Sequence, residues 1–477
     1  MTKIRNKTNS LFGFSREEER GIVALSITII VMLIGLAAIL SLVFVFLMGI
    51  ERARNVGLSE KAYFVAESGI EDALLRIMDA DKELPSVFPY TFSVAGGLAE
   101  VTVEDLPGNT RKITSDGDSS DRTRRLSTAL ILAADEVGFH HGAQIGDGGL
   151  VMNQASKIIG SVFSNGPIVG SNSPTITGDA FTAGTSTVSG MVIDGNVVAY
   201  GIEDSSVSGS ATSSDTISTS SIGGNATADS LIDCSGSIVG DAYYMTISNC
   251  TVDGDEFPGT EPPSELEPED MPIDDDKIEE WKQKAEEGGV IDSCDGSNNY
   301  EPADGERLGP VRIDCNLVVD GNKEIIIEGF VWVHGNIFLE NKAILRLDSS
   351  FNTMSSAIIA DRPGSPGSQG RVEVRNSAEL MGSGTEGSYL MLISMNRSAS
   401  QDGDNIAIEV GNGGSSSIYY APHGLIAIQN NIDVVEVTAY QLQLSNNVTI
   451  EYEQGLANSQ FSAGPQSGYS VVLWREE

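Results

Sequence analysis

A short motif recurs through the middle of the chain and limits the folds open to it. The motif reads [Ile/Val]-x-Gly-[Ser/Asp/Asn], and its glycines are Gly160, Gly178, Gly195, Gly209, Gly224, Gly240 and Gly254. Successive glycines are 14 to 18 residues apart, which is shorter than the period of helical repeats. Such a spacing is typical of one coil of a parallel β-helix, and the sequence predicts a mainly β fold containing a right-handed parallel β-helix, or β-solenoid, over residues 138–256.

The apolar residue of each motif is expected to point inward and to stack on its equivalent in the next coil. The column that this register predicts contains Ile176, Ile193, Val207, Ile222 and Ile238. The alternative is a disordered low-complexity stalk, because Ser, Thr and Asn are abundant here. The regular recurrence of Ile and Val favours the solenoid.

The motif is interrupted and then returns. Residues 257–290 form an acidic, Pro-rich loop followed by a helix, since "DDDKIEEWKQKAEEGG" begins with acids and ends with Gly288 and Gly289. Ile278, Trp281 and Ala285 share one helix face, and Trp281 is expected to be a core contact. From residue 291 to residue 477 strand patterns resume, so the solenoid is expected to continue and to be closed by "GPQSGYSVVLWREE".

A second feature lies near the N-terminus, where no charged residue occurs from Ile22 to Ile50. About 20 apolar residues are enough for a helix to cross a bilayer, so residues 22–50 are predicted to form a transmembrane helix. A secretory signal peptide has a shorter apolar region and is a poor fit. The basic residues that precede the run are Lys3, Arg5, Lys7, Arg16 and Arg20. By the positive-inside rule they keep residues 1–21, a leader segment, in the cytoplasm, and the rest of the chain is then exported from a single-pass anchor in the cell membrane.

The helix is expected to continue beyond the membrane. Over residues 51–84 apolar side chains recur in steps of three and four, as in an amphipathic helix; they are Tyr63, Ala66, Ile70, Ala73, Leu74 and Ile77. Residues 85–137 alternate apolar and polar residues between turn signals, which predicts a small β-meander head packed on this helix.

The two N-terminal stretches carry a family resemblance. "RGIVAL" at residues 20–25 and "AYFVAESGIEDAL" at residues 62–74 resemble the N-terminal region of type IV pilin-like proteins of the PilX-type minor pilin and fimbrial biogenesis family. The resemblance implies that the leader is removed after Gly21, that Ile22 becomes the first residue, and that the head is pilin-like. It also implies a membrane, other pilin-like subunits and the pilus assembly machinery as partners, with a place in a pilus. Ser26 stands where major pilins carry glutamate, which favours an accessory role; a plain, uncleaved anchor is the alternative.

The four cysteines lie beyond the predicted span, where disulfides persist. They are Cys234, Cys250, Cys294 and Cys315, and four cysteines allow three pairings. Cys234 and Cys250 are 16 residues apart, close to one coil, and equivalent positions on successive coils lie about 4.8 Å apart. That favours a 234–250 bridge and leaves a 294–315 bridge across the loop where the chain re-enters the solenoid; four free thiols are the alternative.

Motifs for catalysis and metal binding are missing from the sequence. It contains no HExxH, no CxxC and no phosphate-binding loop, so no cofactor, metal or catalytic residue is predicted. The adjacent residues His140 and His141 are expected at an exposed corner. The formal net charge of −38 argues against a nucleic-acid partner.

The predicted function is structural or adhesive, as a minor type IV pilus-like subunit or a fimbrial biogenesis component, and not enzymatic. The alternatives are a β-helix enzyme acting on surface polysaccharides and a glycan-binding adhesin, which would add surface glycans as partners. An enzyme would need paired carboxylates, and the acids beside the motif glycines could supply them: Asp179, Asp194, Asp241 and Asp253. An adhesin would need a tip or groove rich in exposed aromatic residues.

Overall fold

The computed structural model describes residues 16–476 apart from 79–84, 86, 107–109, 121, 133–134, 260–262, 366, 413–417 and 465–468. Part of the predicted leader, residues 1–15, and the end of the predicted amphipathic segment, residues 79–84, therefore lie outside the described residues. The chain divides into two compact units. The first consists of Met1–Ile131 and Val471–Glu477, and the second of Leu132–Ser470. The second unit is thus inserted, along the sequence, between two segments of the first.

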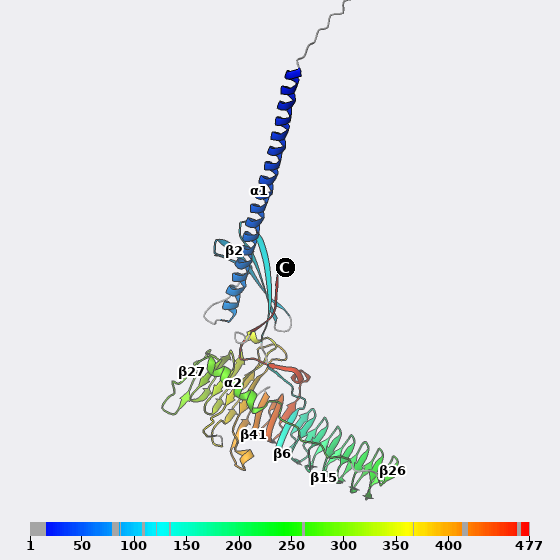
Figure 1. The fold of residues 1–477 in the computed structure, drawn as a ribbon. Coiled ribbons are helices and arrows are strands. Elements are labelled where there is room, and N and C mark those ends of the chain that lie inside the picture. The colour runs from blue at the N-terminus through cyan, green and yellow to red at the C-terminus, as the bar shows by residue number, and fades with distance from the viewer. Residues whose placement is uncertain are drawn as a thin grey trace, which may run out of the picture. The chain divides into compact units, whose positions relative to one another are not determined.

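The first unit contains one long helix, α1 (Arg16–Met78) (Figure 1). From Val23 to Gly57 every side chain is exposed. Beyond this stretch the helix has a buried stripe, which consists of Ala62, Val65, Ala66, Ile70, Ala73 and Ile77. The expectation of one helix, apolar in its first half and amphipathic in its second, is confirmed, although Tyr63 and Leu74 are only half-buried.

The stripe packs on a five-stranded sheet, the head. Its order is β1 (Tyr90–Val94), β2 (Gly97–Leu106), β3 (Thr110–Asp118), β4 (Thr123–Leu132) and β46 (Tyr469–Glu476). The first four strands form the antiparallel meander that the sequence predicts. The expectation that residues 464–477 close the solenoid is wrong, because β46 belongs to the head sheet. Arg124 at the start of β4 forms an ion pair with Glu476 at the end of β46, at 2.8 Å.

Two glycines allow the helix and the head sheet to approach each other closely. A Cβ atom added at Gly117 would lie 2.2 Å from the carbonyl oxygen of Ala62 and 2.3 Å from the amide nitrogen of Ala66. A Cβ atom added at Gly69, on the helix, would lie 2.1 Å from Oγ of Ser115. Neither position has room for a side chain: at Gly117 backbone packs on backbone, and at Gly69 the side chain of Ser115 occupies the space.

The second unit is a β-solenoid whose coils each contribute short strands to three columns of parallel strands. In the earlier half of the chain the first column contains β8 (Val162–Ser164), β11 (Ala180–Thr182), β14 (Val197–Ala199), β17 (Ala211–Ser213), β20 (Ala226–Ala228), β23 (Ala242–Tyr244) and β26 (Glu256–Pro258). The second contains β9 (Ile168–Ser171), β12 (Thr187–Ser189), β15 (Gly201–Glu203), β18 (Thr216–Thr219), β21 (Leu231–Cys234) and β24 (Thr246–Ser248). The third contains β7 (Lys157–Ile159), β10 (Thr175–Ile176), β13 (Val192–Ile193), β16 (Ser206–Val207), β19 (Ser221–Ile222), β22 (Ser237–Ile238) and β25 (Thr251–Val252).

The predicted core column lies in the third of these columns. Ile176 pairs with Ile193, Ile193 with Val207, Val207 with Ile222 and Ile222 with Ile238. All five side chains are buried, so the register read from the motif is confirmed. The right-handed sense of the coils stays a prediction.

The later half of the chain builds the same three columns. The first contains β27 (Val290–Ile291), β30 (Val311–Ile313), β33 (Val331–Val333), β36 (Ser356–Ala360) and β39 (Leu390–Ser394). The second contains β28 (Asn299–Tyr300), β31 (Asn316–Asp320), β34 (Ile337–Glu340), β37 (Val372–Arg375) and β40 (Ile406–Gly411). The third is divided between two sheets. One contains β29 (Arg307–Leu308), β32 (Glu324–Ile327), β35 (Ile344–Leu347) and β38 (Glu379–Met381), and β42 (Asp433–Val434) and β44 (Thr449–Glu451) belong to the sheet of β7. The long strands β41 (Ile418–Gln429) and β43 (Glu436–Ser445) each extend through the first two columns.

The two halves form one continuous stack, but in an order that the chain does not follow. Strand β43 pairs in parallel with β6 (Ala143–Asn153), and β44 pairs with β7, so the last coil lies on the first. In Figure 1 the strands between β27 and β41 lie on one side of β6, and the coils that lead through β15 to β26 lie on the other. The solenoid does continue after residue 291, but it does not continue from β26.

A segment returns from the β26 end and crosses the junction between the halves. We call residues 263–274 the strap. Its contacts run from Ala183, which forms a β-bridge with Leu266, to Gln144, whose side-chain amide donates to the carbonyl of Asp270 at 2.7 Å. Farther along, the hydroxyl of Tyr420 accepts from the amide of Ile273 at 3.1 Å. The strap therefore touches coils of both halves.

The strap leads into helix α2 (Asp275–Glu287), which is capped by Asp274. The predicted face of Ile278, Trp281 and Ala285 is fully buried. Trp281 stacks on Phe330 and Phe461, with ring centroids 4.8 Å and 5.3 Å apart, as a core contact should. Next to it β5 (Asp135–Val137) pairs with β45 (Ser459–Phe461). The described part of this unit also contains three short 3-10 helices: η1 (Ser349–Phe351), η2 (Ala399–Gln401) and η3 (Gln454–Asn458).

Candidate functional site

The first half of α1 is the largest apolar surface that the structure describes. Within the described residues, α1 is the one helix long and apolar enough to span a membrane. Its apolar side chains do not pack against the rest of this chain; Met32 is 77% exposed and Phe46 is 70% exposed. Two polar side chains of the stretch bond within the helix, where the hydroxyls of Thr28 and Ser41 donate to the carbonyls of Ala24 and Ala37 at 2.7 Å and 2.8 Å. Such a surface suits a lipid or protein environment that offers no hydrogen bonds.

The residues predicted for processing and for the ends of the span all lie in this helix. Gly21 and Ile22 lie inside α1, which begins at Arg16. Ile50 is exposed, and Glu51 and Arg52 follow it. Cleavage after Gly21 stays a prediction.

The cysteines form two disulfides in the structure, in the pairing favoured by their spacing. Cys234 is bonded to Cys250 and Cys294 to Cys315, with Cα atoms 5.0 Å and 5.7 Å apart. The first bond joins the coils next to β26, and the second joins the coils next to β27. Each end of the solenoid, where a terminal coil has a neighbour on one side only, is therefore fastened by a covalent bond.

Two of the four acids that an enzyme could have used contribute to the corners of the solenoid. Residues that follow the motif glycines accept from the backbone amide of the equivalent residue one coil on. The Oδ1 atom of Asp179 accepts from Asn196 at 2.7 Å, and that of Asp241 accepts from Asp255 at 2.9 Å. Asn196, Ser210 and Asn225 occupy the coils between them and bond in the same way. Asp194 and Asp253 lie exposed and outside this column, so the structure does not bring the four carboxylates together.

His141 departs from the sequence expectation. His140 is exposed, but His141 is half-buried and lies 3.3 Å from a carboxylate oxygen of Glu269 in the strap. Burial lowers the pKa of His141, and the charge of Glu269 offsets this only in part. The strap covers this corner, and its position could not be predicted from the sequence.

Among the described residues no three His, Cys, Asp or Glu side chains are grouped as a metal site requires.

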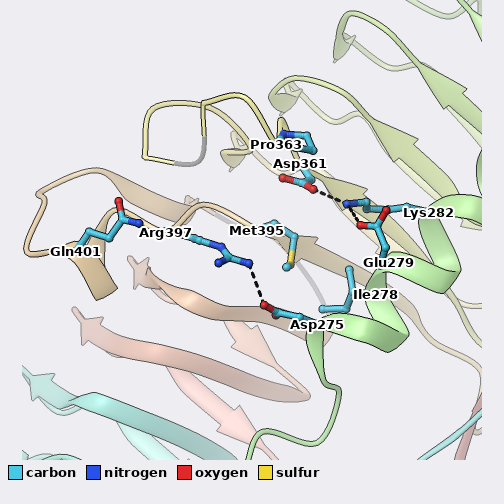
Figure 2. A pocket seen from close by; sticks show the side chains of 9 residues that line it. All are labelled: Asp275, Ile278, Glu279, Lys282, Asp361, Pro363, Met395, Arg397 and Gln401. Atoms are coloured by element: carbon cyan, nitrogen blue, oxygen red, sulfur yellow. Dashed lines mark hydrogen bonds and ion pairs between the residues drawn. The ribbon is translucent and has the colours of Figure 1, made fainter.

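A pocket of about 370 Å³ lies beside α2 (Figure 2). It is lined by Asp275, Ile278, Glu279, Lys282, Asp361, Pro363, Met395, Arg397 and Gln401. Four of these residues belong to α2, and the others follow β36 and β39, so the pocket lies between the helix and the ends of solenoid strands. None of these nine lining residues is aromatic.

The charged groups of the pocket are paired with one another. Nζ of Lys282 lies 2.7 Å from Oδ2 of Asp361 and also contacts the carboxylate of Glu279. Burial lowers the pKa of Lys282, but the hydrogen bonds that its ammonium donates to Asp361 and Glu279 outweigh this and leave that pKa above its ordinary value. At the N-terminus of the helix, Asp275 bonds Arg397 at 2.9 Å and His423 at 2.7 Å. These pairs attach α2 to the solenoid.

Sequence reasoning missed the Lys282–Asp361 pair and the strap contacts. Their partners are separated by 79 and more than 80 residues in the chain, and no local pattern marks them. A lysine on the helix face next to Trp281 was the one available signal, because charged residues are rarely fully buried unless they are paired.

No protein-family model and no curated protein sequence matches the chain. Among solved structures the chain is similar to the crystal structure of the competence-associated pilin ComZ from Thermus thermophilus. The two are 12% identical, with a TM-score of 0.28 over 88% of this chain and 97% of that chain. That score is too low to establish a common overall fold.

Proposed function

We propose that this protein is a membrane-anchored, exported structural protein that acts as a minor subunit of a type IV pilus-like machine or as a fimbrial biogenesis component. The observation that carries the proposal is the division of α1. Its first half exposes an apolar surface on all sides, and its second half is the helix on which the head sheet packs. One continuous helix therefore provides the anchor and also the surface on which the head sheet packs.

The exposed half requires a partner environment. Each Å² of apolar surface removed from water contributes about 25 cal/mol, and a large contiguous apolar surface marks a site of contact with a membrane or another protein. A lipid bilayer would cover the helix while the subunit is in the membrane, and neighbouring subunits would cover it after assembly into a filament.

We propose a single-pass orientation with the N-terminus in the cytoplasm and the solenoid outside the cell. The basic residues of the leader support it through the positive-inside rule. The two disulfides support it as well, because such bonds persist in an oxidising compartment. We also propose that the leader is removed after Gly21, and the serine at position 26 supports an accessory rather than a bulk filament role.

We propose that the solenoid is structural and not enzymatic. Support comes from Asp179 and Asp241, whose carboxylates hold the corners of successive coils together. The charged groups of the pocket beside α2 likewise bond to one another.

A second candidate is an adhesin that binds surface glycans at the β26 end of the solenoid. Tyr243 and Phe257 stack there with ring centroids 4.7 Å apart and planes 8° apart, and Phe257 is 41% exposed. Exposed aromatic rings are suited to contact the apolar faces of sugars. Phe257→Ala should then lower binding to a glycan array without changing membrane attachment.

The anchoring proposal is tested by fractionation and by protease treatment of intact cells. The wild-type protein should pellet with membranes, and protease added outside should remove the solenoid. Leu36→Arg places a charge at the centre of the apolar run and should reduce membrane retention, whereas Glu60→Arg, outside the run, should not. Recovery of the wild-type protein in the soluble cytoplasmic fraction would contradict the proposal.

A further inference from the structure

Three charged side chains meet at α2, two from the helix itself and one from the solenoid. Nζ of Lys282 lies 2.7 Å from Oδ2 of Asp361, and the carboxylate of Glu279 contacts the same nitrogen (Figure 2). The side chains of Lys282 and Asp361 are 5% and 10% exposed, whereas that of Glu279 is 54% exposed. An amine and a carboxyl are thus held together away from water, with a second carboxylate at the amine.

The surroundings of the pair are apolar on one side. Nζ of Lys282 lies 5.0 Å from the ring centroid of Trp332, whose indole donates to the backbone carbonyl of Asp361 at 3.3 Å. Ile278 and Met395 also line the pocket. Removing two charges from water is costly even when they are paired, so an uncharged product at this position would be favoured over the ion pair.

We propose that Lys282 and Asp361 form an intramolecular amide, an isopeptide bond. One proton passes from the Lys282 ammonium to the Asp361 carboxylate, which leaves a neutral amine beside a neutral carboxylic acid. Nζ attacks Cγ of Asp361, and Glu279 accepts the second amine proton and delivers it to the departing hydroxyl. The N–C bond forms, one C–O bond breaks, and one water leaves. No oxidant, reductant or activated co-reactant is needed.

Neither disulfide joins the two elements that carry these partners. Lys282 lies on α2, and Asp361 directly follows β36 in the solenoid. The amide would fix α2 to the stack and so hold the strap across the junction between the halves. Unlike the two disulfides, it would survive reduction. This inference does not depend on the proposed function.

Tryptic peptide mapping of the reduced, alkylated full-length protein tests the proposal. An amide at Lys282 prevents cleavage after that residue, so the peptide ending at Lys282 should be lost. In its place a branched peptide should appear that contains Lys282 and Asp361 and is lighter than the sum of its two arms by one water. A linear peptide ending at Lys282, together with a linear peptide containing Asp361, would overturn the proposal.

Three variants separate chemistry from folding. Lys282→Arg keeps a cation beside Asp361 but cannot form the amide, so its map should contain only linear peptides. Asp361→Asn should yield the same branched mass as the wild type, because ammonia leaves instead of water. Glu279→Gln keeps a polar group but cannot accept the proton, and its branched fraction should fall several-fold. A branched peptide of unchanged yield in Lys282→Arg would show that another residue is linked and would overturn the assignment.

Discussion

Ile450 lies beside Ile158, so the last coil of the solenoid stacks on its first. The pairing places the later half of the chain before the earlier half along the stack. The open ends are then β26 and β27, and each is fastened by its own disulfide. The junction itself is held by strand pairing and by the strap.

The core column gives the first prediction. Ile193→Asp should destabilise the solenoid by more than about 4 kcal/mol, because it removes a buried side chain and leaves an unpaired charge between Ile176 and Val207. Thermal unfolding followed by circular dichroism measures the loss. Val192→Asp, whose side chain is only half-buried, is the matched control and should cost much less. Equal losses in the two variants would mean that the column does not point inward.

The head gives the second prediction. Gly117→Val should unfold or strongly destabilise the head, because its Cβ atom would lie 2.2 Å from the backbone oxygen of Ala62. Gly57→Ala is the control, since a Cβ atom there meets nothing within 4 Å and alanine favours the helix by up to about 1 kcal/mol. Limited proteolysis of the purified full-length proteins reports on the head. A protease-resistant Gly117→Val head would show that helix and sheet do not pack in this way.

The disulfides give the third prediction. Non-reducing peptide mapping should return the 234–250 and 294–315 bridges from exported protein. The double variant Cys234→Ser/Cys250→Ser should lose about 3 kcal/mol of stability, and hydrogen exchange should rise first in residues 242–258. Four alkylatable thiols or crossed pairs in the wild type would contradict the structure.

A buried carboxyl group gives the fourth prediction. Burial raises the pKa of Glu436 well above its ordinary value; its Oε2 has no hydrogen-bond partner, and its Oε1 accepts from Thr438 at 2.7 Å. The folded protein holds the proton of Glu436 more tightly than the unfolded chain does. The contribution of this proton to the free energy of unfolding is therefore complete at a pH below the pKa of the unfolded chain. Between that pKa and the raised pKa of the folded protein, the contribution falls by about 1.4 kcal/mol per pH unit as the pH rises.

Glu436→Gln removes this titration. Urea unfolding between about pH 4 and pH 8 should therefore show the wild type losing stability relative to the variant as the pH rises. Glu409→Gln, which removes a half-buried carboxylate paired with Arg375 at 2.7 Å, is the comparison and should not reproduce that trend. Parallel pH curves for the wild type and Glu436→Gln would show that Glu436 is ionised in the folded protein.

The local patterns of the sequence were enough to predict the elements. The spacing of the motif glycines defines the coils and their inward residues, and the absence of charge from Ile22 to Ile50 defines the apolar half of α1. The cysteine spacing likewise follows from the coil length. Each of these signals lies within about one coil or a few helix turns.

The arrangement of the elements could not be predicted in the same way. The pairing of Ile450 with Ile158 depends on which strands have an unpaired edge. Many strands of this chain have similar sequence patterns, so the pattern does not select the partner. The sequence of β46 does not set it apart from other strands. It pairs with β4 because the head sheet, which is built from residues more than 300 positions earlier in the chain, has an unpaired edge there. Glu436 and Lys282 appear in the sequence as ordinary surface residues. Both are buried in the folded protein, because segments far apart in the chain pack against them.

The most direct test of the central proposal is the N-terminal sequence of the protein recovered from the cell surface. Processing by a prepilin-type peptidase predicts that the sequence begins at Ile22, and that Gly21→Val leaves the leader attached. A surface protein whose sequence begins before Gly21 would contradict the pilin-like account and would identify the chain as a plain membrane-anchored solenoid.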